Sequence, residues 1–183
     1  FYVAFLHRDA FSLATFSTRR VGQCPVGSGR KHLRRMLLSL LEARPEGGTD
    51  FAAGMGQATA PLRRRGLVVI LSDFMDDPEG IAKVASRLRY QGSDVIAMQL
   101  HDPAERAFEF SSITRFHDIE TGEIIVVDPQ VIQDQYRREW DAHETALKEA
   151  CLRHGFEHVS LPVMDDYDLP LAAYIRKRME LFA

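Results

Sequence analysis

The sequence predicts an α/β protein with three layers, in which helices cover both faces of a doubly wound, mainly parallel β-sheet. Two apolar runs, Leu67–Leu71 and Val95–Leu100, carry no charge, which is typical of parallel strands buried on both faces. Segments around them carry apolar residues at three- and four-residue steps, the period of an amphipathic helix. Since parallel strands need crossover connections, this alternation of strands and helices favours a parallel sheet.

The amino-terminal region predicts a helix end, a hairpin and an amphipathic helix. Phe1–Leu6 resembles the last turns of a helix that begins upstream. Asp9–Ser17 partly alternates and predicts a strand, with Val21–Val26 as its hairpin partner. Because proline has no amide hydrogen to donate, Pro25 places the second strand at a sheet edge. Lys31–Arg44 has helical periodicity.

The middle of the chain predicts two helices around the first buried strand. Asp50–Arg65 contains good helix formers, although Pro61 should kink it. After the strand Leu67–Leu71, Asp77-Pro78-Glu79 supplies a helix cap, a proline in the first turn and an early acid, and Gly92 ends that helix.

The carboxyl-terminal part predicts a hairpin, a long helix, an edge strand and a closing helix. Trp140 lies on the apolar stripe of the long helix and is expected to anchor it on the sheet. Pro162 places the last strand at the opposite sheet edge from Pro25. The predicted ranges are Ile113–Ile119 with Glu123–Val127 for the hairpin, Asp128–Gly155 for the long helix, Val159–Val163 for the strand and Leu169–Phe182 for the closing helix.

Composition indicates one domain over residues 1–183. A chain of 183 residues buries about 70% of its unfolded surface, enough for a single core. The 23 basic and 26 acidic residues give a net charge of −3, so we expect no nucleic-acid partner. Cys24 and Cys151 are too few for a disulfide scaffold, and the sequence shows no signal peptide and no apolar run of about 20 residues. These features predict a cytoplasmic location with no membrane segment.

Candidate metal ligands follow from the predicted topology. Ligands of open parallel sheets bind beyond the carboxyl ends of the strands, where Asp73 would project a carboxylate. The turn Gly47-Gly48-Thr49-Asp50 can bring the Thr49 hydroxyl to the same place. A hydroxyl and a carboxylate, completed by water, suit Mg²⁺. The alternatives are that Thr49 caps the helix beginning at Asp50 and that Asp73 only forms a turn.

Other polar residues predict no catalytic centre. His154 and His158 are expected to be solvated, because Gly155 breaks the helix that would align them as zinc ligands. His143 lies on the apolar stripe of the long helix and is expected to be a packed or boundary residue rather than a base. Asp77 is explained by capping, and Asp76 is expected to be solvated or to support a metal ligand without binding the ion. No nucleophile elbow or phosphate loop occurs, so we expect a protein that is not an enzyme.

Several segments resemble a bacterial family, the von Willebrand factor A-like domain of unknown function 58. The resemblance covers nearly the whole chain, and its most specific block is Arg65–Phe74 with Asp76–Glu79; Gly47–Asp50, Thr121–Glu123 and Val127–Pro129 also match. It implies a metal-ion-dependent adhesion site to which Thr49 and Asp73 contribute. The first motif of such sites, Asp-x-Ser-x-Ser, does not occur between Phe1 and Ala183. The domain is therefore expected to lack its first central strand, which would precede Phe1.

The resemblance also implies a function. Relatives are commonly encoded beside MoxR-type AAA+ ATPases, so we expect a metal-dependent protein-binding module that acts as an adaptor or co-chaperone of such an ATPase. One alternative is a Mg²⁺-dependent hydrolase or phosphatase with Asp73 as nucleophile or ligand and Asp77 as acid. The other is a structural domain that has lost metal binding.

Overall fold

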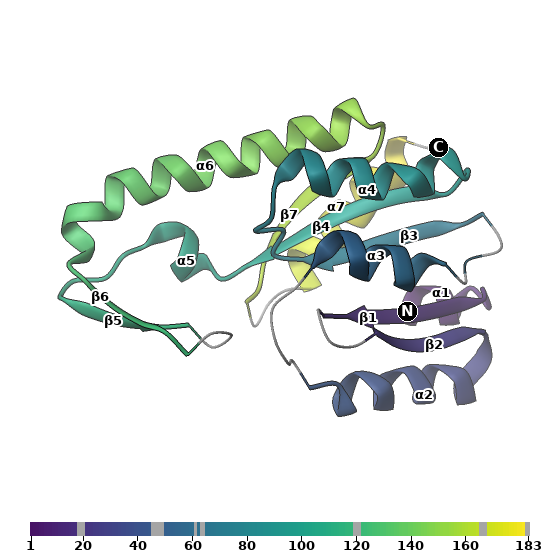
Figure 1. The fold of residues 1–183 in the computed structure, drawn as a ribbon. Coiled ribbons are helices and arrows are strands. Elements are labelled where there is room, and N and C mark those ends of the chain that lie inside the picture. The colour runs from purple at the N-terminus through teal and green to yellow at the C-terminus, as the bar shows by residue number, and fades with distance from the viewer. Residues whose placement is uncertain are drawn as a thin grey trace. The chain divides into compact units, whose positions relative to one another are not determined.

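The computed structural model describes residues 1–17, 21–44, 50–60, 62, 65–118, 122–164 and 168–181. The chain divides into two compact units, each of which is described by itself (Figure 1). The first comprises Phe1–Arg63 with Asp118–Gly122, and the second comprises Arg64–His117 with Glu123–Ala183.

The first unit is built on the predicted hairpin, in which two strands pair antiparallel. Its core consists of Phe11, Cys24 and Met36. His32 joins the second helix to the hairpin, since its Nε2 lies 2.8 Å from the Phe11 carbonyl oxygen. The elements are α1 (Tyr2–Leu6), β1 (Phe11–Phe16), β2 (Val21–Gly27), α2 (Gly29–Glu42) and α3 (Phe51–Thr59).

Helix α3 is shorter than predicted. It ends at Thr59 rather than continuing through a kink to Arg65. The physical reason is Pro61, which supplies no amide hydrogen and whose ring would clash with the preceding turn. Helix α3 also approaches the hairpin closely at Gly54, where a Cβ atom would lie 2.1 Å from the Phe16 ring. Only glycine fits at this contact.

The second unit contains a three-stranded parallel sheet in the order β3-β4-β7. Its strands are β3 (Leu67–Ser72), β4 (Asp94–His101) and β7 (Glu157–Pro162). Leu67 pairs with Asp94, and Ile96 pairs with Glu157. The prediction that the two apolar runs form adjacent parallel strands is confirmed. Helix α4 (Pro78–Tyr90) connects them, capped by Asp77, whose Oδ2 accepts from the Gly80 amide at 2.7 Å.

Helices lie on both faces of this sheet. On one face α4 packs beside the long helix α6 (Pro129–Arg153), and α7 (Asp168–Leu181) contacts β7 from the other face (Figure 1). Strand β4 is buried along most of its length, as predicted. Strand β3 is not, because its Leu67 and Leu71 are both 58% exposed while Ile70 is buried. The expectation that both faces of Leu67–Leu71 are covered is wrong: among the described residues, α4 packs mainly on β4, and α6 and α7 pack on β7.

A hairpin and a short helix lie between β4 and α6. They are α5 (Pro103–Ala107), which was not predicted, and the antiparallel strands β5 (Thr114–His117) and β6 (Ile124–Val127). Phe108 attaches this region to α6 by stacking on Tyr136 with ring centroids 4.2 Å apart. Trp140 makes an edge contact with His101, yet it is only half-buried. The buried side chains among the described residues of α6 are instead Pro129, Leu147, Ala150 and Cys151.

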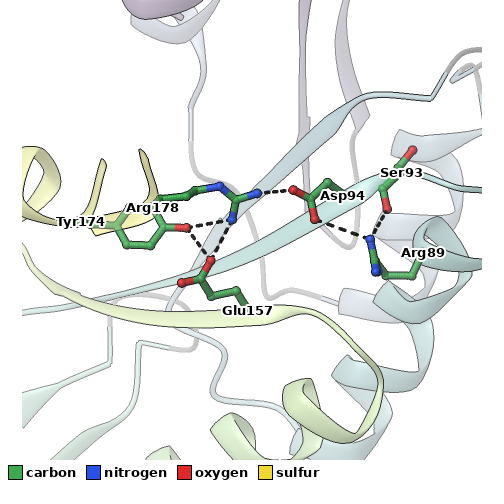
Figure 2. A network of polar contacts seen from close by, with 6 residues as sticks. All are labelled: Arg89, Ser93, Asp94, Glu157, Tyr174 and Arg178. Atoms are coloured by element: carbon green, nitrogen blue, oxygen red, sulfur yellow. Dashed lines mark hydrogen bonds and ion pairs between the residues drawn. The ribbon is translucent and has the colours of Figure 1, made fainter. Parts of the chain in front are cut away.

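Helix α7 is held on the sheet by a polar clasp centred on Arg178 (Figure 2). Its guanidinium donates to Glu157 Oε2 at 2.8 Å and to the Tyr174 hydroxyl at 3.3 Å, and it pairs with Asp94. Asp94 also pairs with Arg89 of α4 at 3.5 Å. Asp94 and Glu157 begin β4 and β7, so the clasp lies at the amino edge of the sheet, opposite the edge where ligands of parallel sheets bind.

The two proline-bearing strands lie in different sheets. Strand β7 is an edge strand, as Pro162 predicted, whereas β2 pairs with β1 in a separate two-stranded sheet. The expectation of opposite edges of one sheet is therefore wrong for the described residues, because Pro25 indicates that one side of its strand is unpaired but not which sheet the strand joins. Within the described ranges, no helix has the length and apolar character needed to cross a bilayer.

Candidate functional site

Asp73 directly follows β3 at the carboxyl edge of the sheet, as predicted, and it is exposed. Its Oδ1 accepts from the Ser72 hydroxyl at 3.2 Å and from the Met75 amide at 3.4 Å. The Ser72 hydroxyl in turn accepts from the Phe74 amide at 3.1 Å. Asp73 thus shapes the turn, but its Oδ2 accepts no hydrogen bond from the described part of the chain. That oxygen faces no competing protein donor there.

Thr49, the second predicted ligand, lies outside the described residues. Its neighbour Asp50 bears on the alternative explanation of Thr49. Asp50 is the N-cap of α3, and its Oδ1 accepts from the Ala53 amide at 2.9 Å. Asp50 thus holds the N-cap position of α3. The interpretation of Thr49 as a cap stays a prediction, because Thr49 lies outside the described residues.

Side chains from two other elements hold the backbone of the Asp73 loop. Gln99 of β4 donates from Nε2 to the Asp73 carbonyl at 3.1 Å. His143 of α6 lies with Nε2 2.8 Å from the Phe74 carbonyl oxygen. His158 of β7 lies with Nε2 3.0 Å from Gln99 Oε1. A hydrogen-bonded network thus connects β7, β4 and α6 to the end of β3.

The histidines of this region differ from expectation in part. His143 is half-buried, which agrees with the prediction of a packed or boundary residue. His158 was expected to be solvated, but it is half-buried, and this burial lowers its pKa below the ordinary 6.5. The expectation failed because His158 belongs to a strand whose face meets Gln99, not to a helix end. His154 pairs with Glu79 at 2.8 Å and is also not simply solvated.

Sequence reasoning missed Gln99, although a signal was present. Gln99 is the one polar side chain in the otherwise apolar run Val95–Leu100. It is only 2% exposed. Because a buried amide requires hydrogen-bond partners, an amide in such a strand indicates a specific polar contact. The sequence does not reveal which residues supply that contact.

The described residues fit one ligand position of a Mg²⁺ ion. An exposed carboxylate with an uncommitted oxygen is the ligand type that Mg²⁺ prefers. No cluster of three or more histidine, cysteine or acidic side chains able to hold a metal occurs among the described residues. Asp73 alone cannot hold a cation that surrenders water reluctantly, so any site requires further oxygen ligands.

A shallow depression lies at the same edge, beside β4 and β7. It is lined in part by His101, Arg106, Arg137 and Ser160. Both arginines are paired, Arg106 with Glu144 at 3.1 Å and Arg137 with Glu109 at 3.3 Å. Burial lowers the pKa of His101 below its ordinary value. This surface therefore presents no excess of positive charge for an anion.

Sequence comparison finds relatives in mycobacteria. Uncharacterized proteins of Mycobacterium tuberculosis and Mycobacterium bovis are each 25% identical to this chain over 162 residues. These residues make up 84% of this chain and 49% of each relative. The chain thus spans about half the length of the curated relatives it matches.

Two solved structures share the fold. One is an aerotolerance-related membrane protein from Bacteroides fragilis, with a TM-score of 0.53 and 13% identity over 90% of this chain and 76% of that one. The other is the conserved hypothetical protein BatB from Bacteroides thetaiotaomicron, with a TM-score of 0.51 and 12% identity over 94% and 80%. At such identities the likeness concerns the fold alone. The profile described as "Protein of unknown function DUF58" matches residues 2–150, and the chain therefore belongs to the DUF58 family.

Proposed function

We propose that this chain is a non-catalytic, metal-dependent protein-binding module in which Asp73 supplies one oxygen ligand to Mg²⁺. The observation that carries the proposal is the exposed Asp73 carboxylate at the carboxyl edge of a parallel sheet, with Oδ2 directed to no donor among the described residues. Thr49 is the second proposed ligand. A partner protein's carboxylate takes an open position on the ion, a role that requires no catalytic base.

We also propose that the fold is of the von Willebrand factor A type. Three parallel strands with helices on both faces fit a von Willebrand factor A-like, doubly wound sheet. Strand β3 has one neighbour in the described sheet, which supports the expectation that the complete fold has another strand beside it. The partner we propose is a MoxR-type AAA+ ATPase or its client, on the strength of the family resemblance.

A Mg²⁺-dependent hydrolase is the less favoured function. That reading needs Asp77 as an acid, but the Asp77 carboxylate is engaged as the α4 cap at 2.7 Å from the Gly80 amide. A group that satisfies a helix terminus is poorly placed to transfer protons to a substrate.

Paramagnetic Mn²⁺ tests the metal site, because it takes the same oxygen ligands as Mg²⁺ and broadens nearby amide signals even when binding is weak. In a ¹⁵N-labelled sample of residues 1–183, we expect selective broadening at Asp73 and Met75 that excess Mg²⁺ reverses. Asp73→Asn should remove the effect. Asp76→Asn, a matched change on an exposed neighbouring acid, should retain most of it.

Partner capture tests the binding role. A purified MoxR-type ATPase should be retained by the immobilised chain in Mg²⁺ and released by a chelator, and Asp73→Asn should behave like the chelator. Uniform Mn²⁺ broadening over all surface acids, or equal behaviour of Asp73→Asn and Asp76→Asn, would favour the structural-domain reading instead.

A further inference from the structure

The loop that carries Asp73 has a backbone conformation that its own sequence does not favour. Phe74 has a φ of 54°, in the left-handed region that glycine adopts freely and a bulky residue does not. Such a conformation is unfavourable for a bulky residue and persists only where surrounding structure enforces it. The Phe74 side chain is 1% exposed, so burial fixes the ring. The carbonyl groups of Asp73 and Phe74 are each held by a side chain from another element.

His143 provides this support from α6. A carbonyl oxygen can only accept, so His143 Nε2 carries the hydrogen in its 2.8 Å contact with Phe74. The two residues are separated by 69 positions in the chain, and the contact therefore records how α6 packs on the sheet. It is a tertiary restraint on the loop rather than a local turn bond.

Gln99 provides the second support from β4. Its amide is nearly inaccessible to water, so both of its ends must be paired in the protein. Nε2 donates to the Asp73 carbonyl, and Oε1 accepts from His158 Nε2. Because His158 fixes the carbonyl end of the amide, the donor end is constrained to point at Asp73.

We propose that Gln99 and His143 are positioning residues that fix where Asp73 presents its carboxylate, an inference that rests on the proposed metal-binding role of Asp73. Neither side chain is a ligand. They act as the outer supports of metal sites do, by holding the ligand's backbone in one place before the ion arrives. The loop is then preorganised, so that little ordering is required on binding.

Matched substitutions separate donation from packing. Gln99→Glu keeps the shape and the acceptor for His158 but removes the donor to Asp73, whereas Gln99→Leu removes both. His143→Gln keeps an N–H near the position of Nε2, and His143→Leu removes it. We expect Gln99→Glu and His143→Leu to weaken Mn²⁺ binding at Asp73 about tenfold or more. His143→Gln should restore at least half of the lost affinity.

Two readouts distinguish this inference from the proposed function. In metal-free protein, the ¹³C shifts of Phe74 report its left-handed backbone, and they should change in Gln99→Glu and His143→Leu but not in Asp73→Asn. If the native chain shows no Mn²⁺ effect at Asp73 while these shifts respond as stated, the metal role fails and the positioning of the loop stands. If Phe74 shifts and Mn²⁺ affinity are both unchanged in Gln99→Glu and His143→Leu, the positioning inference is refuted.

Discussion

Replacing Arg178 with alanine should release α7 from the sheet without unfolding the second unit. Among the described side chains of this helix none is fully buried, and the half-buried ones include Tyr174 and Arg178. The Arg178 side chain is 21% exposed, but its partners Asp94 and Glu157 are 48% and 39% exposed. The docking of α7 therefore depends largely on the clasp shown in Figure 2.

The free energy that Arg178 contributes to the docking of α7 follows from the partial exposure of its partners. Ion pairs with solvent-exposed partners contribute about 0.5–1 kcal/mol each, so the two pairs of Arg178 together contribute about 1–2 kcal/mol. A loss of that size raises the open population of α7 roughly 5- to 30-fold. Strand β4 should keep its protection, because its residues from Val95 to Met98 are buried and Asp94 retains Arg89 as a partner.

Hydrogen exchange followed by mass spectrometry measures this directly. Peptides from α7 should exchange 5- to 30-fold faster in Arg178→Ala, and peptides from β4 should not change. Arg176→Ala, on an exposed position of the same helix, is the control for loss of charge and helix propensity. High salt should accelerate exchange of α7 in the native chain. Unchanged exchange in Arg178→Ala, or equal acceleration by Arg176→Ala, would show that the clasp does not hold α7 on the sheet.

Three further predictions concern buried side chains. Leu147→Ala should lower the free energy of unfolding by about 2–5 kcal/mol, because Leu147 is fully buried. Trp140→Ala should lower it by only about 2 kcal/mol, because Trp140 is half-buried. Urea denaturation that ranks the two variants in the reverse order contradicts this prediction. Burial lowers the pKa of His158 below 6.5, so the unfolded chain binds more protons than the folded one at acidic pH. The stability that depends on neutral His158 is fully present above about pH 6.5 and is lost as the pH falls through the lowered pKa of His158. Thermal melts of His158→Gln should therefore depend less on pH between about 7.5 and 5.5 than native melts. Burial raises the pKa of the Cys151 thiol to about 12. The thiol should therefore resist a disulfide reagent at about pH 8 until denaturant is added. Rapid reaction of Cys151 in the native state would show that α6 opens.

Local patterns in the sequence determined the order and type of most elements. Asp77 and Asp128 mark helix starts because a capping carboxylate satisfies amides within the next turn, and both do so in the structure. The runs Leu67–Leu71 and Val95–Leu100 indicated parallel strands because they are apolar and carry no charged residue. The position of Asp73 beyond the first run followed from that assignment alone.

The tertiary structure decided which residues face one another. Gln99 and His143 support the Asp73 loop from 26 and 69 residues away, and Arg178 reaches Asp94 across 84 residues. The exposed face of β3 likewise differs from the local pattern. The physical reason is that periodicity and helix caps act within a few turns of the chain. Hydrogen-bond partners and burial are set instead by the sheet register and by the helices packed on each face, and no single segment of the sequence encodes these.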